Sequence, residues 1–220
     1  MGLKIDLGCG SNKKEGYIGV DILDVPEVDY VTDLSKNPLP FEDNSVKAVY
    51  SNHFFEHIAD PSPIFQQIGR VAIDGAQLEI WTPYAFSSGA FIFDHKFFPT
   101  EEPYMHMCVK FVDFWEPILY SRWLFKEVCY LVNPETLADI QENKVSLSFA
   151  IKYFKDIVQE FGVFIEIRKN YSGPIVIPKK TFVTYRGGEH MSIPRDKISR
   201  RFTFRFWEKS VFQRLKRRIK

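Results

Sequence analysis

Short apolar stretches, each followed by glycine, proline or polar residues, open the chain. Four of them lie at residues 3–7, 17–21, 28–33 and 46–51. Their length and their β-branched and aromatic residues predict strands. A helical period at residues 62–73 precedes a fifth predicted strand at 77–82. Strands that alternate with helices or loops predict an α/β fold with a mostly parallel sheet.

Periodicity is lost between residues 84 and 130, which hold 14 of the 35 aromatic residues. This stretch follows the fifth predicted strand, so we expect an aromatic-rich insertion at the edge where that strand ends. Its expected role is that of a lid that selects the substrate. Beyond it the pattern predicts helices at 134–142 and 147–161 and strands at 163–169, 180–186 and 201–207. We expect a single domain over residues 1–220.

Composition excludes several classes of protein. The three cysteines are far apart and form no Cys-x-x-Cys pair, which argues against a disulfide framework and for a reducing compartment. The sequence has neither a signal-peptide pattern nor about 18 consecutive apolar residues. We therefore expect a cytoplasmic protein.

Charge is distributed unevenly along the chain. Residues 195–220 carry eleven Lys and Arg against two acidic residues, whereas residues 1–194 have an excess of eight acidic residues. Within this end, residues 208–220 form the polar and apolar faces of a basic amphipathic helix, which is typical of a segment that lies on an anionic membrane or on a partner. Peripheral contact with the inner face of a membrane is one interpretation, and packing on the acidic body is the other.

Candidate binding residues follow the first three predicted strands. Gly8-Cys9-Gly10 allows close approach of a ligand to the backbone, and Asp21 and Asp33 end the next two strands. The carboxyl ends of parallel strands meet at one edge of a sheet, where ligands bind. Asp21 can accept hydrogen bonds from ribose hydroxyls and Asp33 from an adenine amino group. The sequence therefore predicts a nucleotide site.

Five segments in this order carry a family resemblance. They are Asp6-Leu7-Gly8-Cys9-Gly10-Ser11-Asn12, Gly19-Val20-Asp21, Asp33-Leu34, Leu39-Pro40-Phe41-Glu42-Asp43 and Glu56-His57. Together they resemble the class I S-adenosylmethionine-dependent methyltransferases, in particular the small-substrate, type 11-like branch. The resemblance covers about residues 3–83. It implies a Rossmann-like sheet, mostly parallel with an antiparallel last strand, and S-adenosylmethionine as the cofactor.

The resemblance also implies which residues bind that cofactor. Asp6, Gly8 and Gly10 would line the methionine moiety, Asp21 the ribose, Asp33 with Leu34 the adenine, and Asn52 or His53 the sulfonium side; Cys9 and Ile22 complete the expected set. Two features depart from the family pattern. Asn12 replaces the third glycine, and only fifteen positions separate Asp6 from Asp21, so we expect a very short or absent first crossover helix. A Rossmann oxidoreductase would have G-x-G-x-x-G, but the sixth position here is Lys13.

His53-Phe54-Phe55-Glu56-His57 matches the H-x-x-E-H pattern of inverted zinc proteases. Such an enzyme needs a long helix through this site, and Pro61 and Pro63 end or redirect the chain within a few residues. We therefore expect no metal. For methyl transfer to a hydroxyl, a histidine is suited as general base near neutral pH. His53 and His95 are the candidate catalytic residues.

The predicted function is methyl transfer from S-adenosylmethionine to a hydroxyl or amine of a small molecule, such as a sugar or nucleotide-sugar in a glycan or secondary-metabolite pathway. Two alternatives are a non-catalytic binding protein on a methyltransferase scaffold and an RNA methyltransferase. DNA is not an expected partner, because the acidic body is unsuited to phosphates and the Asn-Pro-Pro-Tyr type of motif is absent after the fourth strand. The sequence leaves the oligomeric state open, and a homodimer is compatible with it.

Overall fold

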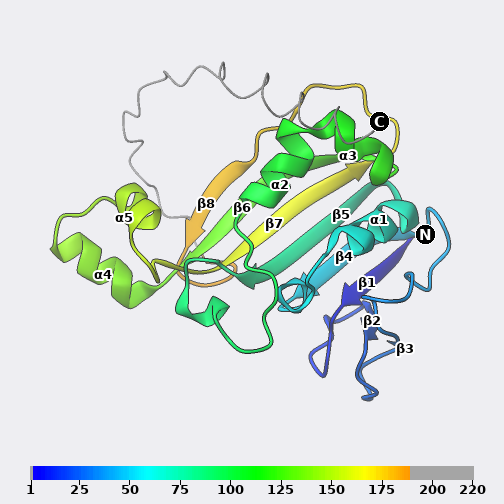
Figure 1. Cartoon of the computed structure of the whole chain (residues 1–220), viewed down its shortest axis with the longest axis horizontal. Coiled ribbons are helices and arrows are strands. Elements are labelled where there is room, and N and C mark those ends of the chain that lie inside the picture. Colours follow the sequence, from blue (N-terminus) through cyan, green and yellow to red (C-terminus); the bar gives the residue numbers. More distant parts are fainter. Residues whose placement is uncertain (1, 189–220) are drawn as a thin grey trace, which may run out of the picture.

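An eight-stranded sheet organises the part of the chain that the computed structural model describes, residues 2–188 (Figure 1). The strands are β1 (Leu3–Leu7), β2 (Ile18–Asp21), β3 (Tyr30–Val31), β4 (Val46–Asn52), β5 (Ala72–Pro83), β6 (Arg122–Val132), β7 (Val158–Arg168) and β8 (Lys179–Val183). The helices are α1 (Ser62–Val71), α2 (Glu102–Met105), α3 (Val112–Ile118), α4 (Pro134–Glu142) and α5 (Leu147–Tyr153). Short 3-10 turns at Phe55–His57 and Ser88–Ala90 and a π-helical turn at His106–Lys110 complete the set.

The strand order is β3-β2-β1-β4-β5-β7-β6-β8. β7 pairs antiparallel with both of its neighbours, and the other pairs are parallel. The order reverses between β1 and β4. The chain first adds β2 and β3 on one side of β1, and it then adds β4 and β5 on the other side. The mostly parallel α/β sheet that the sequence predicts is thus confirmed. β8 is an additional edge strand, so the antiparallel strand is next to last along the described chain.

α1, α2 and α3 cover the front face of the sheet (Figure 1). The buried residues of α1 include Ile64, Phe65, Ile68 and Val71, spaced as one helical face. Beneath the helices runs a row of side chains that is apolar across five neighbouring strands. In register, this front row is Ile5, Val49, Leu78, Ile165 and Phe125, and none of them is more than 2% exposed.

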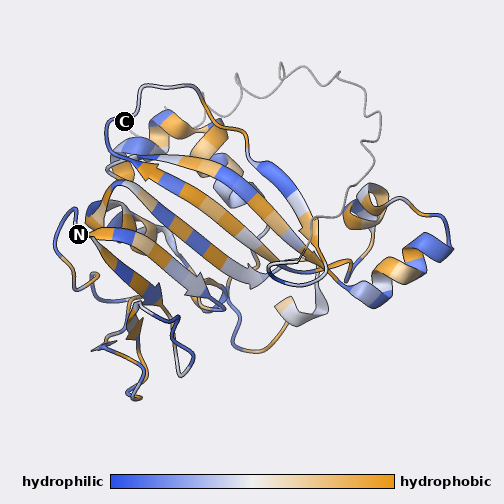
Figure 2. Cartoon of the chain, turned by 180° about the vertical axis from the view of Figure 1, so that it is seen from behind, coloured by the Kyte–Doolittle hydropathy of each residue, from blue (hydrophilic) through white to orange (hydrophobic). Residues whose placement is uncertain are grey.

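The back face of the sheet has no helix over it within residues 2–188 (Figure 2). Right-handed crossovers that lead in opposite directions from the switch point lie on opposite faces of a sheet. The connections at 8–17 and 22–29, which lead from β1 to β3, contain no helix. This confirms the predicted lack of a first crossover helix, and it explains why this face remains uncovered. The row of paired residues that faces this side, the back row, is Asp6, Tyr50, Glu79, Phe164 and Glu127.

Two predicted segments differ from the structure. Residues 122–130 of the expected insertion belong to β6, whose two apolar runs are separated by Lys126 and Glu127 at a β-bulge, so that no period of two is visible. The helix predicted at 147–161 ends at Tyr153, and β7 begins at Val158. By contrast, α4 lies at the predicted residues, where Asn133 caps the backbone N–H groups of Glu135 and Thr136. The predicted strand at 201–207 and the tail at 208–220 lie outside the described residues.

Candidate active site

The glycine turn after β1 lies against the acid that ends β2. Gly8 and Gly10 have positive φ values of 69° and 50°, and a Cβ on Gly8 would lie 2.4 Å from atoms of the Phe54 side chain. The Gly10 N–H donates a 2.8 Å hydrogen bond to Oδ2 of Asp21. A Cβ on Gly10 would meet nothing within 4 Å, so the outer side of this turn is open. The sequence therefore brings Gly8, Cys9, Gly10 and Asp21 together as predicted.

Asp6 lies under this turn and is 2% exposed. Its Oδ2 accepts a 2.7 Å hydrogen bond from the backbone N–H of Lys14, which closes the loop between β1 and β2. Burial raises the pKa of Asp6 to about 6, although the bond from Lys14 opposes that shift. The carboxyl therefore shapes the loop from beneath.

The residues predicted to hold the adenine follow β2 and β3. Leu34 is buried, and Ile22 is 61% exposed beside Asp21. The Asp33 carboxylate accepts hydrogen bonds from Ser35 and pairs with Lys36 at 2.7 Å. Hydrogen bonds from Lys36 and then Ser35 lower the pKa of Asp33 to about 2. Asp33 is thus charged and already engaged by its own loop.

Asn52 and His53 end β4 on the inner side of the site. Oδ1 of Asn52 is buried and has no hydrogen-bond partner among the described residues. A buried acceptor without a partner is costly, which points to a ligand or water at this position. His53 has a positive φ of 52°, and its N–H donates to the carbonyl of Trp81 at 3.0 Å. This left-handed conformation turns the chain sharply at the carboxyl end of β4.

The imidazole of His53 lies between two carboxylates. Nδ1 is 3.0 Å from Oε1 of Glu56, and Nε2 is 3.1 Å from Oε1 of Glu160. Hydrogen bonds to Glu160 and then to Glu56 raise the pKa of His53 to about 9. The ring in this arrangement is protonated near pH 7, with one N–H directed at each carboxylate. It is therefore unsuited to the role of general base that the sequence suggested.

Glu160 and Arg186 are site residues that sequence reasoning missed. Arg186 pairs with Oε2 of Glu160 at 2.5 Å, and its guanidinium lies 4.6 Å from the centre of the Trp81 ring. Glu160 lies 107 positions from His53, in a segment whose pattern predicted a helix. No local signal could have found this pair, because it depends on the antiparallel position of β7 beside β5.

His95, the other expected catalytic residue, lies beside His57 rather than His53. The two rings are perpendicular, with centroids 4.9 Å apart. Nδ1 of His95 is 2.9 Å from the carbonyl oxygen of Ala90. Backbone N–H groups of Lys96 and Phe97 donate to the carbonyl of Glu56, at 2.7 and 3.0 Å. The loop that carries His95 is thus fixed to the turn after β4.

The aromatic residues of the expected lid fall into two groups. Tyr104 and Trp123 are at most 2% exposed and belong to the core on the front face. Phe91, Phe93 and Phe98 are exposed in the loop after β5, and the rings of Phe91 and Phe98 stack at 5.2 Å. Phe114 and Tyr120 are exposed as well, on α3 and just after it, so the second group is the exposed one in the loop after β5.

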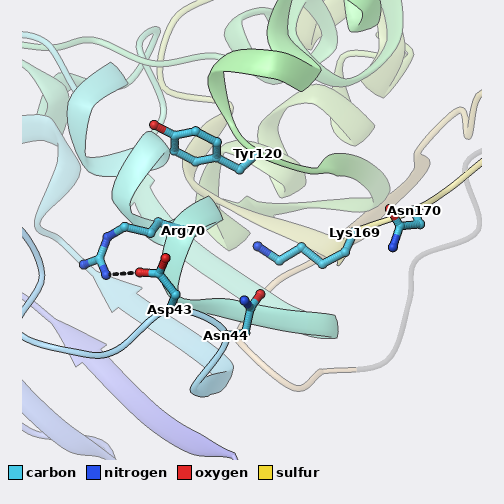
Figure 3. Close-up of a pocket in the computed structure, with 6 residues that line it drawn as sticks. All are labelled: Asp43, Asn44, Arg70, Tyr120, Lys169 and Asn170. Atoms are coloured by element: carbon cyan, nitrogen blue, oxygen red, sulfur yellow. Dashed lines mark hydrogen bonds and ion pairs between the residues drawn. The ribbon is translucent and has the colours of Figure 1, made fainter.

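An open hollow of about 650 Å³ lies at the other end of the sheet (Figure 3). It is lined by Asp43, Asn44, Arg70, Tyr120, Lys169 and Asn170. Asn44 precedes β4, whose opposite end carries Asn52. Arg70 is engaged by Asp43 at 2.6 Å (Figure 3). The hollow is therefore separate from the site at the carboxyl ends of the strands.

Comparison with known proteins identifies a domain match and similar folds. A methyltransferase domain family matches residues 5–80. The fold resembles YcgJ from Bacillus subtilis, with a TM-score of 0.50 at 12% identity over 77% of this chain and 93% of that one. A SAM-dependent methyltransferase from Archaeoglobus fulgidus gives a TM-score of 0.49 at 20% identity over 75% and 86%. A Haloferax volcanii protein solved in complex with the Trm112 methyltransferase activator gives 0.46 at 15% over 77% and 83%.

No curated protein sequence matches the chain significantly. The likeness to YcgJ supports the fold, and the family match over residues 5–80 covers the glycine turn, Asp21, Asp33 and the end of β4. The strand order with one antiparallel strand belongs to the same class of fold. Residues 5–80 thus match a methyltransferase domain, and the described chain has a Rossmann-like fold of the class I methyltransferase type; both findings support an enzyme that uses S-adenosylmethionine as its cofactor.

Proposed function

We propose that the enzyme methylates a hydroxyl or amine of a small molecule, and that this acceptor is a sugar or nucleotide-sugar. The observation that carries the proposal is the exposed aromatic group Phe91, Phe93 and Phe98, which follows β5 and so emerges near the end of β4. Exposed aromatic rings are suited to sugar faces and to apolar groups. The polar side of the same region is formed by His53, Glu160 and Arg186.

The site has the features that S-adenosylmethionine requires. The outer side of Gly10 is open, and Oδ1 of Asn52 is a buried acceptor in need of a partner. We assign Asp6, Gly8, Cys9 and Gly10 to the methionine end, Asp21 with Ile22 to the ribose, Asp33 with Leu34 to the adenine, and Asn52 with His53 to the sulfonium side. When bound, the cofactor supplies an electrophilic methyl group. The protein contributes mainly alignment of the acceptor with that group.

Cofactor placement is tested by calorimetry with S-adenosylhomocysteine, the demethylated product. Asp21→Ala removes charge-assisted hydrogen bonds, each worth roughly 1.5–3 kcal/mol, so we expect at least a tenfold loss of affinity. Asp24→Ala changes an exposed acid of the same loop and serves as the matched control. Equal affinity of the wild type and Asp21→Ala would refute the assignment of the ribose site. Melting curves of both variants show whether the fold is retained.

The acceptor is tested with S-adenosylmethionine labelled in its methyl group. The enzyme is incubated with a panel of sugars, nucleotide-sugars and amines and with fractionated metabolite extract, and labelled products are identified by mass spectrometry. Phe93→Ala should lower kcat/KM for the acceptor at least fivefold and leave S-adenosylhomocysteine affinity unchanged. Phe114→Ala, an exposed ring on α3, is the control. Transfer to RNA alone, or equal kcat/KM in both variants, would overturn the small-molecule proposal.

His53 is proposed to orient the carboxylate of Glu160, which it contacts at 3.1 Å, toward the acceptor. His53→Ala is then expected to lower kcat by a larger factor than it lowers the affinity for S-adenosylhomocysteine, because His53 also lies on the sulfonium side of the cofactor. His106→Ala replaces an exposed histidine of the π-helical turn and should leave both values unchanged. Unchanged kcat in His53→Ala would remove this residue from the site.

We also propose that the basic tail, residues 208–220, contacts an anionic membrane surface. The tail lies outside the described residues, so its sequence carries the proposal: six Lys and Arg against one Glu, with an apolar side formed by Val211, Phe212, Leu215 and Ile219. Within residues 2–188, no helix is long and apolar enough to cross a membrane. The full chain should co-sediment with phosphatidylglycerol vesicles at low salt, whereas a chain that ends at Glu208 should stay in the supernatant. Equal sedimentation would dismiss the membrane contact.

A further inference from the structure

We propose that Glu56, His57 and His95 bind a divalent transition-metal ion, with zinc as the favoured metal. Each of these residues offers one donor atom, and the three donor atoms lie within 4.8 Å of one another. Zinc bonds of about 2.1 Å place tetrahedral ligands roughly 3.4 Å apart, so small side-chain rotations would close the site. The site goes beyond methyl transfer, because it can be loaded with metal whatever the acceptor is.

The carboxylate of Glu56 provides an observation independent of the clustering. Glu56 is 1% exposed, and its Oε1 interacts with Nδ1 of His53. Its Oε2 is buried and has no hydrogen-bond partner among the described residues. An unpartnered carboxylate oxygen in the interior is strongly disfavoured unless a cation or a donor reaches it. A metal ion between Glu56 and the two histidines would satisfy this oxygen.

The Nδ1 atoms of both histidines have oxygen partners outside the proposed metal site. Nδ1 of His57 lies 3.2 Å from Oδ2 of Asp94, and Nδ1 of His95 lies 2.9 Å from the carbonyl oxygen of Ala90. If each Nδ1 donates its proton to that oxygen, the lone pair remains on Nε2. Carboxylate and carbonyl partners of this kind fix the tautomer and raise the basicity of a ligating imidazole.

The two segments that contribute ligands are also held together by the backbone. Lys96 and Phe97, the two residues that follow His95, donate backbone hydrogen bonds to the carbonyl of Glu56. Preorganisation of this kind reduces the entropy that ion binding must overcome. The ligands therefore come from two separate segments, the turn after β4 and the loop after β5.

The donor set decides which ion fits. Two imidazoles and one carboxylate suit zinc and its neighbours in the first transition row, whereas magnesium prefers oxygen donors and keeps several waters. Three protein ligands leave a fourth position, as in catalytic rather than structural zinc sites. The side chain of His57 is 35% exposed, so one of the three ligands is in contact with solvent.

This arrangement differs from the metal site of the proteases whose H-x-x-E-H motif residues 53–57 match. An inverted zinc protease uses both histidines of H-x-x-E-H on one helix. Here His53 has its two ring nitrogens directed at Glu56 and Glu160, and residues 55–57 form a 3-10 turn. His95 takes the place of His53 as ligand. The proposal thus departs from the expectation of no metal. The spacing within the motif could not predict this site, because His95 lies outside the motif.

The test uses the full chain without a histidine tag, stripped with EDTA and dialysed into metal-free buffer. Zinc is added in slight excess, unbound metal is removed, and bound metal is measured by plasma mass spectrometry. We expect close to one zinc per chain for the wild type. Cobalt should give visible d–d absorption typical of four-coordinate sites, while magnesium should not compete at millimolar concentration. Wild-type protein that retains no zinc above a buffer blank would overturn the proposal.

Variants locate the ion. His57→Ala and His95→Ala should each weaken zinc binding at least tenfold in a chelator competition, and Glu56→Gln, which keeps the shape of the side chain, should also weaken it. His106→Ala is the matched control and should bind as the wild type does. If all four variants retain zinc equally, the ion lies elsewhere and the proposal fails. Circular dichroism and S-adenosylhomocysteine affinity of the metal-free variants report folding, and that affinity tests methyltransferase function separately from metal binding.

Discussion

The two faces of the sheet differ in residue type and in coverage by helices, although the same strands form both. The front row, Ile5, Val49, Leu78, Ile165 and Phe125, is wholly apolar and lies under three helices. The back row lies one residue from the front row in each strand except β6, where a bulge adds one, and it alternates acids with aromatic rings. Because successive side chains of a strand point to opposite faces, two neighbouring rows report two environments. The comparison shows that one helical layer suffices to bury the core of this enzyme.

Long cationic side chains occupy the place of helices on the back face. Nζ of Lys14 lies 3.7 Å from the centre of the Tyr50 ring and 2.8 Å from Oε2 of Glu79. Arg186 covers the ring of Trp81 in a similar way. Such side chains shield apolar surface with their stems while the charged groups stay in water. The back face is therefore stabilised by many weak contacts, and its residues should be more tolerant of substitution.

The largest effect is expected on the front face. Phe125 is fully buried and its ring lies 6.0 Å from that of Tyr104. Phe125→Ala removes this packing and leaves a cavity, so we expect the free energy of unfolding to fall by about 3–5 kcal/mol. Urea denaturation followed by tryptophan fluorescence measures this. A loss below about 1 kcal/mol would mean that the helices of the front face do not form a tight core.

A buried acid on the back face gives the next largest effect, and it depends on pH. The pKa of Asp6 rises from its ordinary value near 4 to about 6 in the folded state, so the folded chain binds this proton more tightly than the unfolded chain. Ionised Asp6 therefore lowers stability above pH 6, and this cost is absent below about pH 4. Asp6→Asn should gain stability relative to the wild type as pH rises from 4 to 7.5, by up to about 3 kcal/mol.

This prediction is measured as the difference in unfolding free energy between the wild type and Asp6→Asn at several pH values, without cofactor. Asp24→Asn, an exposed acid on the neighbouring loop, is the control and should give a nearly constant difference. A constant difference for Asp6→Asn as well would show that Asp6 is hydrated in the folded protein.

The sequence predicted the two halves of the fold unequally. In the first 83 residues, short strands bounded by glycine and acids gave the parallel half of the sheet and the residues at its carboxyl edge, because each signal is local. β6 was missed, since its apolar residues form two runs around Lys126 and Glu127, where a β-bulge interrupts the alternation. The end of the predicted helix at 147–161 was wrong because β7 pairs with strands distant in sequence, and that pairing overrides local pattern.

The same limit applies to the site. Gly8, Gly10 and Asp21 could be placed from spacing alone, because the turn and the two strand ends are neighbours in the chain. The environment of His53 could not, because Glu160 arrives from β7 and Arg186 from beyond β8. The proximity of His95 to Glu56 depends on the path of an irregular loop. Residue types predicted the chemistry, and tertiary contacts decided which residues meet.

Phe164→Ala tests the back face with the same substitution as Phe125→Ala. Phe164 is half-buried and packs edge-on against Trp81, with ring centroids 5.9 Å apart. Its ring already contacts solvent, so removal leaves little cavity and should cost about 1 kcal/mol. The same urea experiment measures it. If this loss equals that of Phe125→Ala, the back face is covered in solution and the contrast between the two faces is wrong.

The smallest effect concerns the lysine that replaces a helix. Lys14→Met keeps most of the apolar stem over Tyr50 and removes the charge that interacts with the ring and with Glu79. Cation–π contacts and ion pairs at partly exposed sites contribute about 0.5–1 kcal/mol, so the loss of stability should lie in that range. Ion pairs between exposed charges are screened by salt, and the difference from the wild type should therefore shrink in 1 M sodium chloride. Lys47→Met, at a residue of β4 that forms no ion pair within residues 2–188, is the control and should show no such salt dependence. A salt-independent loss in Lys14→Met would assign the effect to the hydrocarbon stem, and the back face would then be held by apolar contact alone.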